Sequence, residues 1–180
     1  MAQFQAFVSG VEVNGKTVLS FIKGMEHFEK IALQILKENG IENIKPEKWY
    51  CQQSWLNAFK KISEKIGSYA LYCIGTKIPE NAQFPPDINS LEKALEAIDI
   101  AYHMNHRGGE IGNYNFYKSL EGSLHLTCNN PYPCEFDRGI IEGIARKFIY
   151  KERYLVAKHD NSAPCRDKGD DLCTYNIEIL

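Results

Sequence analysis

The sequence predicts an α+β fold in which N-terminal helices pack on a C-terminal antiparallel sheet that contains one inserted helix. Two observations support this prediction. Up to Gly108-Gly109 the apolar residues recur mostly at helical spacing, and after this pair most of them alternate at period two. The later segments are then expected to be strand, strand, helix, strand and strand, an order typical of antiparallel sheets. A length of 180 residues suits one domain, with bounds 1–180.

The first segments predict a β-hairpin followed by two helices. Residues 11–22 alternate around Asn14-Gly15, the dipeptide that most readily forms a tight hairpin turn. Apolar residues within 25–38 lie on one helical face, and a glycine just beyond them is suitably placed to end that helix. Residues 46–66 predict a second helix, which begins near a proline and carries a wide aromatic stripe.

The following segments predict a loop region, the strongest helix and then the sheet. Residues 68–86 contain Gly75 and three prolines, so we expect only a helical turn followed by a loop. Residues 87–109 show the clearest helical stripe and end in a Gly-Gly pair. The strands are expected within 110–118, 122–128, 153–159 and 173–180, and the inserted helix within 134–148.

Composition argues against several classes of partner. The net charge is −2 and 44% of the residues are hydrophobic, so no strong positive field would attract nucleic acid. The sequence shows no signal peptide and no apolar run of about 20 residues that would cross a bilayer. We therefore expect a cytoplasmic protein with neither nucleic acid nor membrane as a partner. Six cysteines in such a chain favour free thiols, metal ligands or redox groups over a disulfide framework.

Four of the cysteines form two pairs in polar, turn-rich surroundings. Cys128 and Cys134 flank a segment with two prolines, and Cys165 and Cys173 flank a turn that contains a glycine. Both segments are suited to bringing their ends together. Zinc favours four such ligands in a tetrahedron. The predicted ligands are Cys134, Cys165 and Cys173, with the fourth position open to Cys128, His159 or Asp160.

The C-terminal third resembles the 4-vinyl reductase domain. The resemblance lies in CNNPYPCEFDRGIIEGIARKF and, after a strand, HDNSAPCRDKGDDLCTYNIEI. That family shows a cysteine at the start of a helix that contains glycine, then a strand, then a Cys-x7-Cys hairpin. Its superfamily also includes haem nitric-oxide/oxygen-binding domains, the N-terminal domains of phenol-sensing activators and subunits of a Golgi vesicle-tethering complex. The resemblance implies the NO-signalling/Golgi-transport type of ligand-binding fold.

The resemblance also implies a site and partners. In the phenol-sensing branch, zinc lies beside a buried pocket for a small aromatic ligand, and by position the matching ligands are Cys134, Cys165 and Cys173. The fourth ligand of that branch is a glutamate, but Ser162 stands at its position here, so the fourth ligand stays open. A homodimer formed by the N-terminal hairpin and first helix is implied as well. An output would require a separate signalling partner.

The preferred function is therefore that of a sensory domain that holds a small apolar or aromatic molecule, with structural zinc at the C-terminal hairpin. Aromatic side chains are typical of small-molecule pockets. The predicted pocket residues are Trp49, Trp55, Phe59, Tyr69, Tyr72, Tyr102 and His106. Each of these residues is equally compatible with a place in the hydrophobic core.

Two alternatives remain open at this point. The first is a haem-binding gas or redox sensor, with His103 or His106 as the haem ligand, although the Tyr-x-Ser-x-Arg run of the haem branch is absent. The second is a cysteine-dependent enzyme or reductase accessory protein, because a thiolate near a histidine can act as a nucleophile. No dinucleotide fingerprint or phosphate loop occurs in the sequence. We therefore favour a protein that is not an enzyme.

Overall fold

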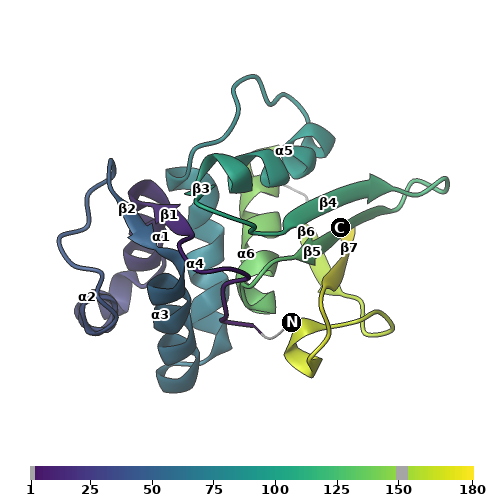
Figure 1. The fold of residues 1–180 in the computed structure, drawn as a ribbon. Coiled ribbons are helices and arrows are strands. Elements are labelled where there is room, and N and C mark those ends of the chain that lie inside the picture. The colour runs from purple at the N-terminus through teal and green to yellow at the C-terminus, as the bar shows by residue number, and fades with distance from the viewer. Residues whose placement is uncertain (1–2, 149–153) are drawn as a thin grey trace.

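The α+β architecture is confirmed by a computed structural model, which describes residues 3–148 and 154–180. Helices α1 to α4 form one side of the molecule, the four-stranded sheet forms the other, and α6 lies between α4 and that sheet (Figure 1). The α-helices are α1 Gly15–Gly24, α2 Glu29–Glu38, α3 Gln52–Lys65, α4 Ser68–Asn81, α5 Leu91–Met104 and α6 Cys134–Ala145. Two short 3₁₀ helices are η1 Glu26–Phe28 and η2 Arg166–Lys168. The strands are β1 Glu12–Asn14, β2 Trp49–Cys51, β3 His106–Arg107, β4 Asn113–Lys118, β5 Leu124–Asn129, β6 Leu155–His159 and β7 Cys173–Ile179.

The C-terminal sheet has the predicted strands, all antiparallel, in the order β4-β5-β7-β6. Its central strand β5 alternates buried and less buried residues, as the period-two pattern predicts, whereas the first three residues of β7 are all buried. The first residue of the third predicted strand, at position 153, lies outside the described residues. The β4–β5 hairpin extends well beyond the rest of the molecule (Figure 1).

The predicted N-terminal hairpin is wrong. Asn14 has extended backbone and caps α1, because its side chain accepts a hydrogen bond from the backbone N–H of Lys16. Gly15 is needed for close packing, since a Cβ there would lie 2.0 Å from the carbonyl oxygen of Lys45. The residues after the turn are therefore helical, and β1 pairs instead with β2 and β3.

The predicted helix over residues 46–66 starts later than expected. Trp49–Cys51 form strand β2, which pairs with β1, so that α3 begins only at Gln52. From there the aromatic stripe is buried as predicted. The ring centroids of Trp55 and Phe59 lie 4.7 Å apart, and that of Phe21 on α1 lies within 5.6 Å of both. These rings belong to one continuous cluster of buried side chains that extends to the four-stranded sheet.

The prediction of a mere helical turn within residues 68–86 is also wrong, since α4 is a full helix. Pro79 lies in its last turn, where the loss of one N–H donor interrupts little of the helix. Gly75 faces α6, and a Cβ at this position would lie 2.2 Å from the carbonyl oxygen of Phe136. Tertiary contact with α6 therefore outweighs the weak helix propensity of these residues.

The Gly139→Ala variant should be less stable than the wild type by about 1–3 kcal/mol. A Cβ at Gly139 would lie 2.3 Å from the carbonyl oxygen of Tyr72 and 3.0 Å from the Cα of Gly75, so α4 and α6 would have to separate. Urea denaturation monitored by circular dichroism measures this change. An unchanged midpoint would mean that the two helices do not approach each other this closely.

Candidate metal centre and cavity

Four side chains that offer metal ligands lie together at the C-terminal hairpin. One ligand atom from each of Cys134, His159, Cys165 and Cys173 lies within 4.8 Å of the other three. The Sγ atom of Cys134 is 3.2 Å from that of Cys173 and 3.9 Å from that of Cys165, and the last two atoms are 3.9 Å apart. Sulfurs bound at about 2.3 Å in a tetrahedron would be about 3.8 Å apart. The three thiols therefore have nearly the spacing of zinc ligands before any metal is added.

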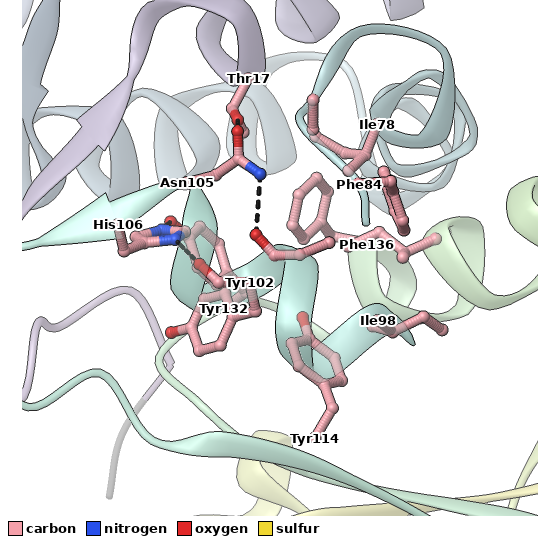
Figure 2. Close-up of a pocket in the computed structure, with 13 residues that line it drawn as sticks. Thr17, Ile78, Phe84, Ile98, Tyr102, Asn105, His106, Tyr114, Tyr132 and Phe136 are labelled. Atoms are coloured by element: carbon pink, nitrogen blue, oxygen red, sulfur yellow. Dashed lines mark hydrogen bonds between the residues drawn. The ribbon is translucent and has the colours of Figure 1, made fainter. Parts of the chain in front are cut away.

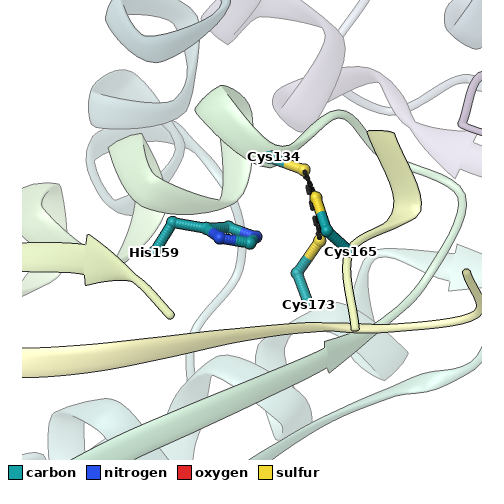
Figure 3. Close-up of side chains that lie close together, drawn as sticks. All are labelled: Cys134, His159, Cys165 and Cys173. Carbon is teal, nitrogen blue, oxygen red and sulfur yellow. Dashed lines mark hydrogen bonds between the residues drawn. The ribbon is translucent and has the colours of Figure 1, made fainter. Parts of the chain in front are cut away.

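Three different elements bring these residues to one point. Cys134 is the first residue of α6, and its carbonyl oxygen accepts a hydrogen bond from the hydroxyl of Tyr175 on β7. His159 ends β6 opposite Tyr175 in the strand register, and the two rings meet edge to face. Its buried Nε2 atom has no hydrogen-bond partner in the described part of the chain. The imidazole points toward the three sulfurs (Figure 3).

The loop between the two hairpin cysteines is held in a fixed shape. The backbone N–H of Cys165 donates to the carboxylate of Asp170 at 2.9 Å, and the 3₁₀ helix η2 follows Cys165 directly. Gly169 ends η2 with a φ of 95°, in the left-handed region that glycine adopts easily. This turn returns the chain to Cys173, the first residue of β7.

The sulfur of Cys173 is the anionic member of the group. Its pKa is lowered to about 4, first because the thiol of Cys134 donates a hydrogen bond to it and then because Arg166 is nearby. The pKa of Cys134 is raised, chiefly because this thiol is the donor in the same hydrogen bond. One proton thus serves both sulfurs, and a metal ion would replace it.

The structure places the other two candidates for the fourth ligand outside the group of four. The Cys128 side chain is fully buried, and burial, followed by the charge of Asp137, raises its pKa well above the ordinary range. Cys128 is therefore a neutral thiol. Asp160 instead accepts hydrogen bonds from the backbone N–H and the hydroxyl of Ser162 at 2.9 and 2.6 Å. His159 is thus the one of the three candidates that joins the cysteines.

A second feature is a small cavity of about 30 Å³ between α5, α6 and the loop after α4. The residues around it are shown in Figure 2 and are Thr17, Ile78, Ala82, Phe84, Ile98, Ala101, Tyr102, Asn105, His106, Tyr114, Tyr132, Phe136 and Ile140. A water molecule needs about 10–15 Å³ on this measure, so the cavity has room for about two water molecules. Pockets for drug-sized ligands measure about 300 Å³ or more, and even a cavity that holds benzene measures about 150 Å³.

Polar groups on the cavity wall already have partners within the protein. Tyr102 donates to the carbonyl oxygen of Ile111 at 2.6 Å, and Tyr114 donates to Asp137 at 2.6 Å. Asn105 accepts from the hydroxyl of Thr17 and donates to the carbonyl oxygen of Ala101 (Figure 2). The wall therefore offers an occupant mainly apolar surface.

The two histidines proposed as haem ligands lie in different surroundings. His103 is half-exposed, and its Nδ1 atom lies 2.9 Å from the carbonyl oxygen of Asp99. His106 lies on β3 and is buried. Its Nδ1 contacts the carbonyl oxygen of Tyr102 at 2.8 Å and its Nε2 contacts the hydroxyl of Tyr132 at 2.7 Å. A carbonyl can only accept, so Nδ1 carries the proton and Tyr132 donates to Nε2.

Of the seven predicted pocket residues, only Tyr102 and His106 line this cavity. The other five lie elsewhere for physical reasons. Trp55 and Phe59 are completely buried in the core, and Tyr69 is 68% exposed. Trp49 lies on β2 beneath the guanidinium of Arg107. Tyr72 donates to Glu142 at 2.7 Å, and burial, followed by this hydrogen bond, raises its pKa to about 12. Helical spacing alone did not separate core residues from pocket residues.

Two buried charged neighbours of the cysteines, Arg166 and Asp137, were missed from sequence. Arg166 and Asp137 form an ion pair in which the side chains are 1% and 0% exposed. Arg166 also donates to the sulfur of Cys173 from its backbone N–H and its Nε, at 3.4 and 3.5 Å. In the sequence both residues stand among other charged residues. Only the position of Arg166 next to Cys165 indicates that it lies near the cysteine cluster.

Comparison with known proteins shows the fold and no closer relationship. No protein-family model matches the chain, and no curated protein matches it significantly. Among solved structures, an H-NOX protein from S. oneidensis in the Fe(II)NO ligation state aligns with a TM-score of 0.67 and 13% identity, over 93% of this chain and 99% of that chain. An unliganded Fe(II) H-NOX mutant from K. algicida aligns with a TM-score of 0.60 and 12% identity, over 93% and 96% of the two chains.

This chain therefore has the fold of H-NOX domains, which is the type of fold predicted from the C-terminal motif. A vinyl-4-reductase family protein from Methanocaldococcus jannaschii aligns with a TM-score of only 0.42 and 16% identity, over 84% of this chain and 94% of that chain. Membership of that particular family stays a prediction. Within the described residues, every helix is too short or too polar to cross a membrane.

Proposed function

We propose that this protein is a ligand-binding sensory domain whose C-terminal hairpin is held by a zinc ion on Cys134, His159, Cys165 and Cys173. The observation that carries the proposal is the convergence of these four ligand atoms within 4.8 Å. Three thiols and one imidazole form a common closed zinc set. The ion would join the start of α6, the end of β6 and the start of β7, so it would stabilise the fold and leave no coordination position open for catalysis.

The ligand would occupy the cavity beside Tyr102 and Tyr114. Its mainly apolar wall supports a small apolar molecule, and its volume of about 30 Å³ restricts that molecule to a few atoms. An aromatic ligand would require movement of Ala82 and Phe84, which lie in the segment that links α4 to α5. A homodimer and a separate signalling partner remain predictions drawn from the resemblance. We propose no enzymatic activity.

Haem is the second candidate because the S. oneidensis neighbour is described in an Fe(II)NO ligation state. The described residues do not fit this group. Both nitrogens of His106 are hydrogen-bonded within the protein, and His103 bonds to its own helix at a half-exposed position. The cavity is about a tenth of the smallest usual ligand pocket. We therefore do not extend haem binding to this chain.

Protein purified without added metal or haem should contain one zinc ion per chain and show no Soret band. Elemental analysis and an absorption spectrum measure both quantities on one sample. Loss of an outer-sphere residue typically lowers metal affinity about 10- to 100-fold, and the His159→Gln variant should show a larger loss of zinc affinity than this. The Asp160→Asn variant is the matched control and should keep its zinc, because Asp160 bonds to Ser162. A Soret band, or zinc retained by His159→Gln, would contradict the proposal.

A further inference from the structure

A continuous series of buried hydrogen bonds joins the cysteine cluster to the cavity. Arg166 donates through its Nε to the sulfur of Cys173 at 3.5 Å and through a terminal nitrogen to the carboxylate of Asp137. The other oxygen of Asp137 accepts from the hydroxyl of Tyr114 at 2.6 Å. Tyr114 lies on the cavity wall. Three side chains thus connect a proposed zinc ligand with the proposed ligand site.

Water has almost no access to this series. The side chains of Arg166 and Asp137 are 1% and 0% exposed, and Tyr114 is 5% exposed. Asn130, which is completely buried, fixes the centre by accepting from Arg166 and donating to Asp137 at 3.3 Å. In such surroundings hydrogen bonds are stronger than in water, and the loss of one cannot be compensated by solvent.

The position of Arg166 makes its contacts with the two anions interdependent. Its guanidinium is shared between the sulfur of Cys173 and the carboxylate of Asp137, which also accepts from Tyr114. If Asp137 lost the Tyr114 donor, its charge would be less well compensated and would attract Arg166 more strongly. Less positive charge would then remain beside the cluster, where three thiolates and one zinc ion leave a net negative charge.

We propose that Arg166 and Asp137 are positioning residues through which the cavity-wall hydroxyl of Tyr114 sets the zinc affinity of the cysteine cluster. The inference rests on the proposed zinc site and adds its regulation. Coupling between two sites is reciprocal, so an occupant that moves the Tyr114 hydroxyl would weaken zinc binding, and zinc would weaken that occupant's binding by the same factor. Through this pathway, an occupant of the cavity would change the zinc affinity of the C-terminal hairpin.

The test compares zinc affinity in Tyr114→Phe and Tyr102→Phe at one pH, by competition with a chromophoric chelator. Both substitutions remove one buried cavity-wall hydroxyl, but the hydroxyl of Tyr102 donates to the carbonyl oxygen of Ile111, whereas that of Tyr114 donates to Asp137. Tyr114→Phe should lower the zinc affinity about 2- to 30-fold, the usual size of such couplings. Tyr102→Phe should stay within twofold of the wild type.

A thermodynamic cycle separates this pathway from a general loss of packing. Lysine cannot reproduce the fork of a guanidinium, so in an Arg166→Lys background the Tyr114→Phe substitution should no longer change zinc affinity. If Arg166→Lys does not fold, Asp137→Asn serves as the background. Equal affinities in all variants, or equal losses in both tyrosine variants, would overturn the inference while leaving the zinc site intact. A wild-type protein that binds no zinc would overturn both.

Discussion

Removal of the metal should lower the melting temperature of the wild-type protein by about 8–16 °C. A ligand that binds only the folded state, present at a thousand times its dissociation constant, stabilises by about 4 kcal/mol. In a chain of this size that corresponds to the stated shift. The four proposed ligands come from the start of α6, the end of β6 and both ends of the hairpin loop, so metal loss would release several elements together. Thermal unfolding with and without a strong chelator measures the shift.

Two cysteine variants make this experiment specific. The Cys173→Ser variant lacks the sulfur that receives hydrogen bonds from both Cys134 and Arg166. It should melt at nearly the same temperature with and without chelator. Cys51→Ser changes an exposed cysteine on β2 that is not one of the four ligands, so its response to chelator should match that of the wild type. A chelator response that persists in Cys173→Ser would remove the basis for the metal centre.

The sheet and the cysteine cluster were predictable because their signals are local. Alternating residues indicate strands of the sheet, and two short cysteine-flanked turns indicate the cluster. The choice of His159 over Cys128 as the fourth member was not predictable. It depends on the register that places His159 opposite Tyr175 and on the burial of Cys128 beside Asp137. Pairing register and burial arise only once the strands have assembled.

The errors in the N-terminal half have the same cause. Gly15 and Gly75 were interpreted as a turn former and a helix breaker, but both occur where another backbone comes too close for a Cβ. Asn14 has two common roles, as a turn residue and as a helix cap, and sequence alone does not choose between them. The cavity was also misplaced, because Trp55 and Phe59 fill the core. Which of several apolar faces remains incompletely packed depends on the whole assembly.

Acidification should reveal the buried imidazole of His106. Burial lowers the pKa of His106 from 6.5 to about 4. Between these two pH values the unfolded chain binds a proton that the folded protein does not bind, so the free energy of unfolding falls as the pH falls. At about 1.4 kcal/mol per pH unit, this histidine should account for a loss of about 3 kcal/mol between pH 6.5 and pH 4. Urea denaturation at half-unit intervals of pH measures the loss.

Comparison with non-titrating variants isolates this contribution. His106→Gln keeps a donor and an acceptor next to Tyr102 and Tyr132, and its stability should fall by about 3 kcal/mol less than that of the wild type over the same pH range. Acid would also release a metal bound by the cysteine cluster, but this release would affect both proteins alike. His103→Gln is measured in parallel as the control for removing an imidazole at a half-exposed position. Parallel curves for the wild type and His106→Gln would mean that the imidazole at position 106 is accessible to water, and the hydrogen bond from Tyr132 to its Nε2 would then have to open readily.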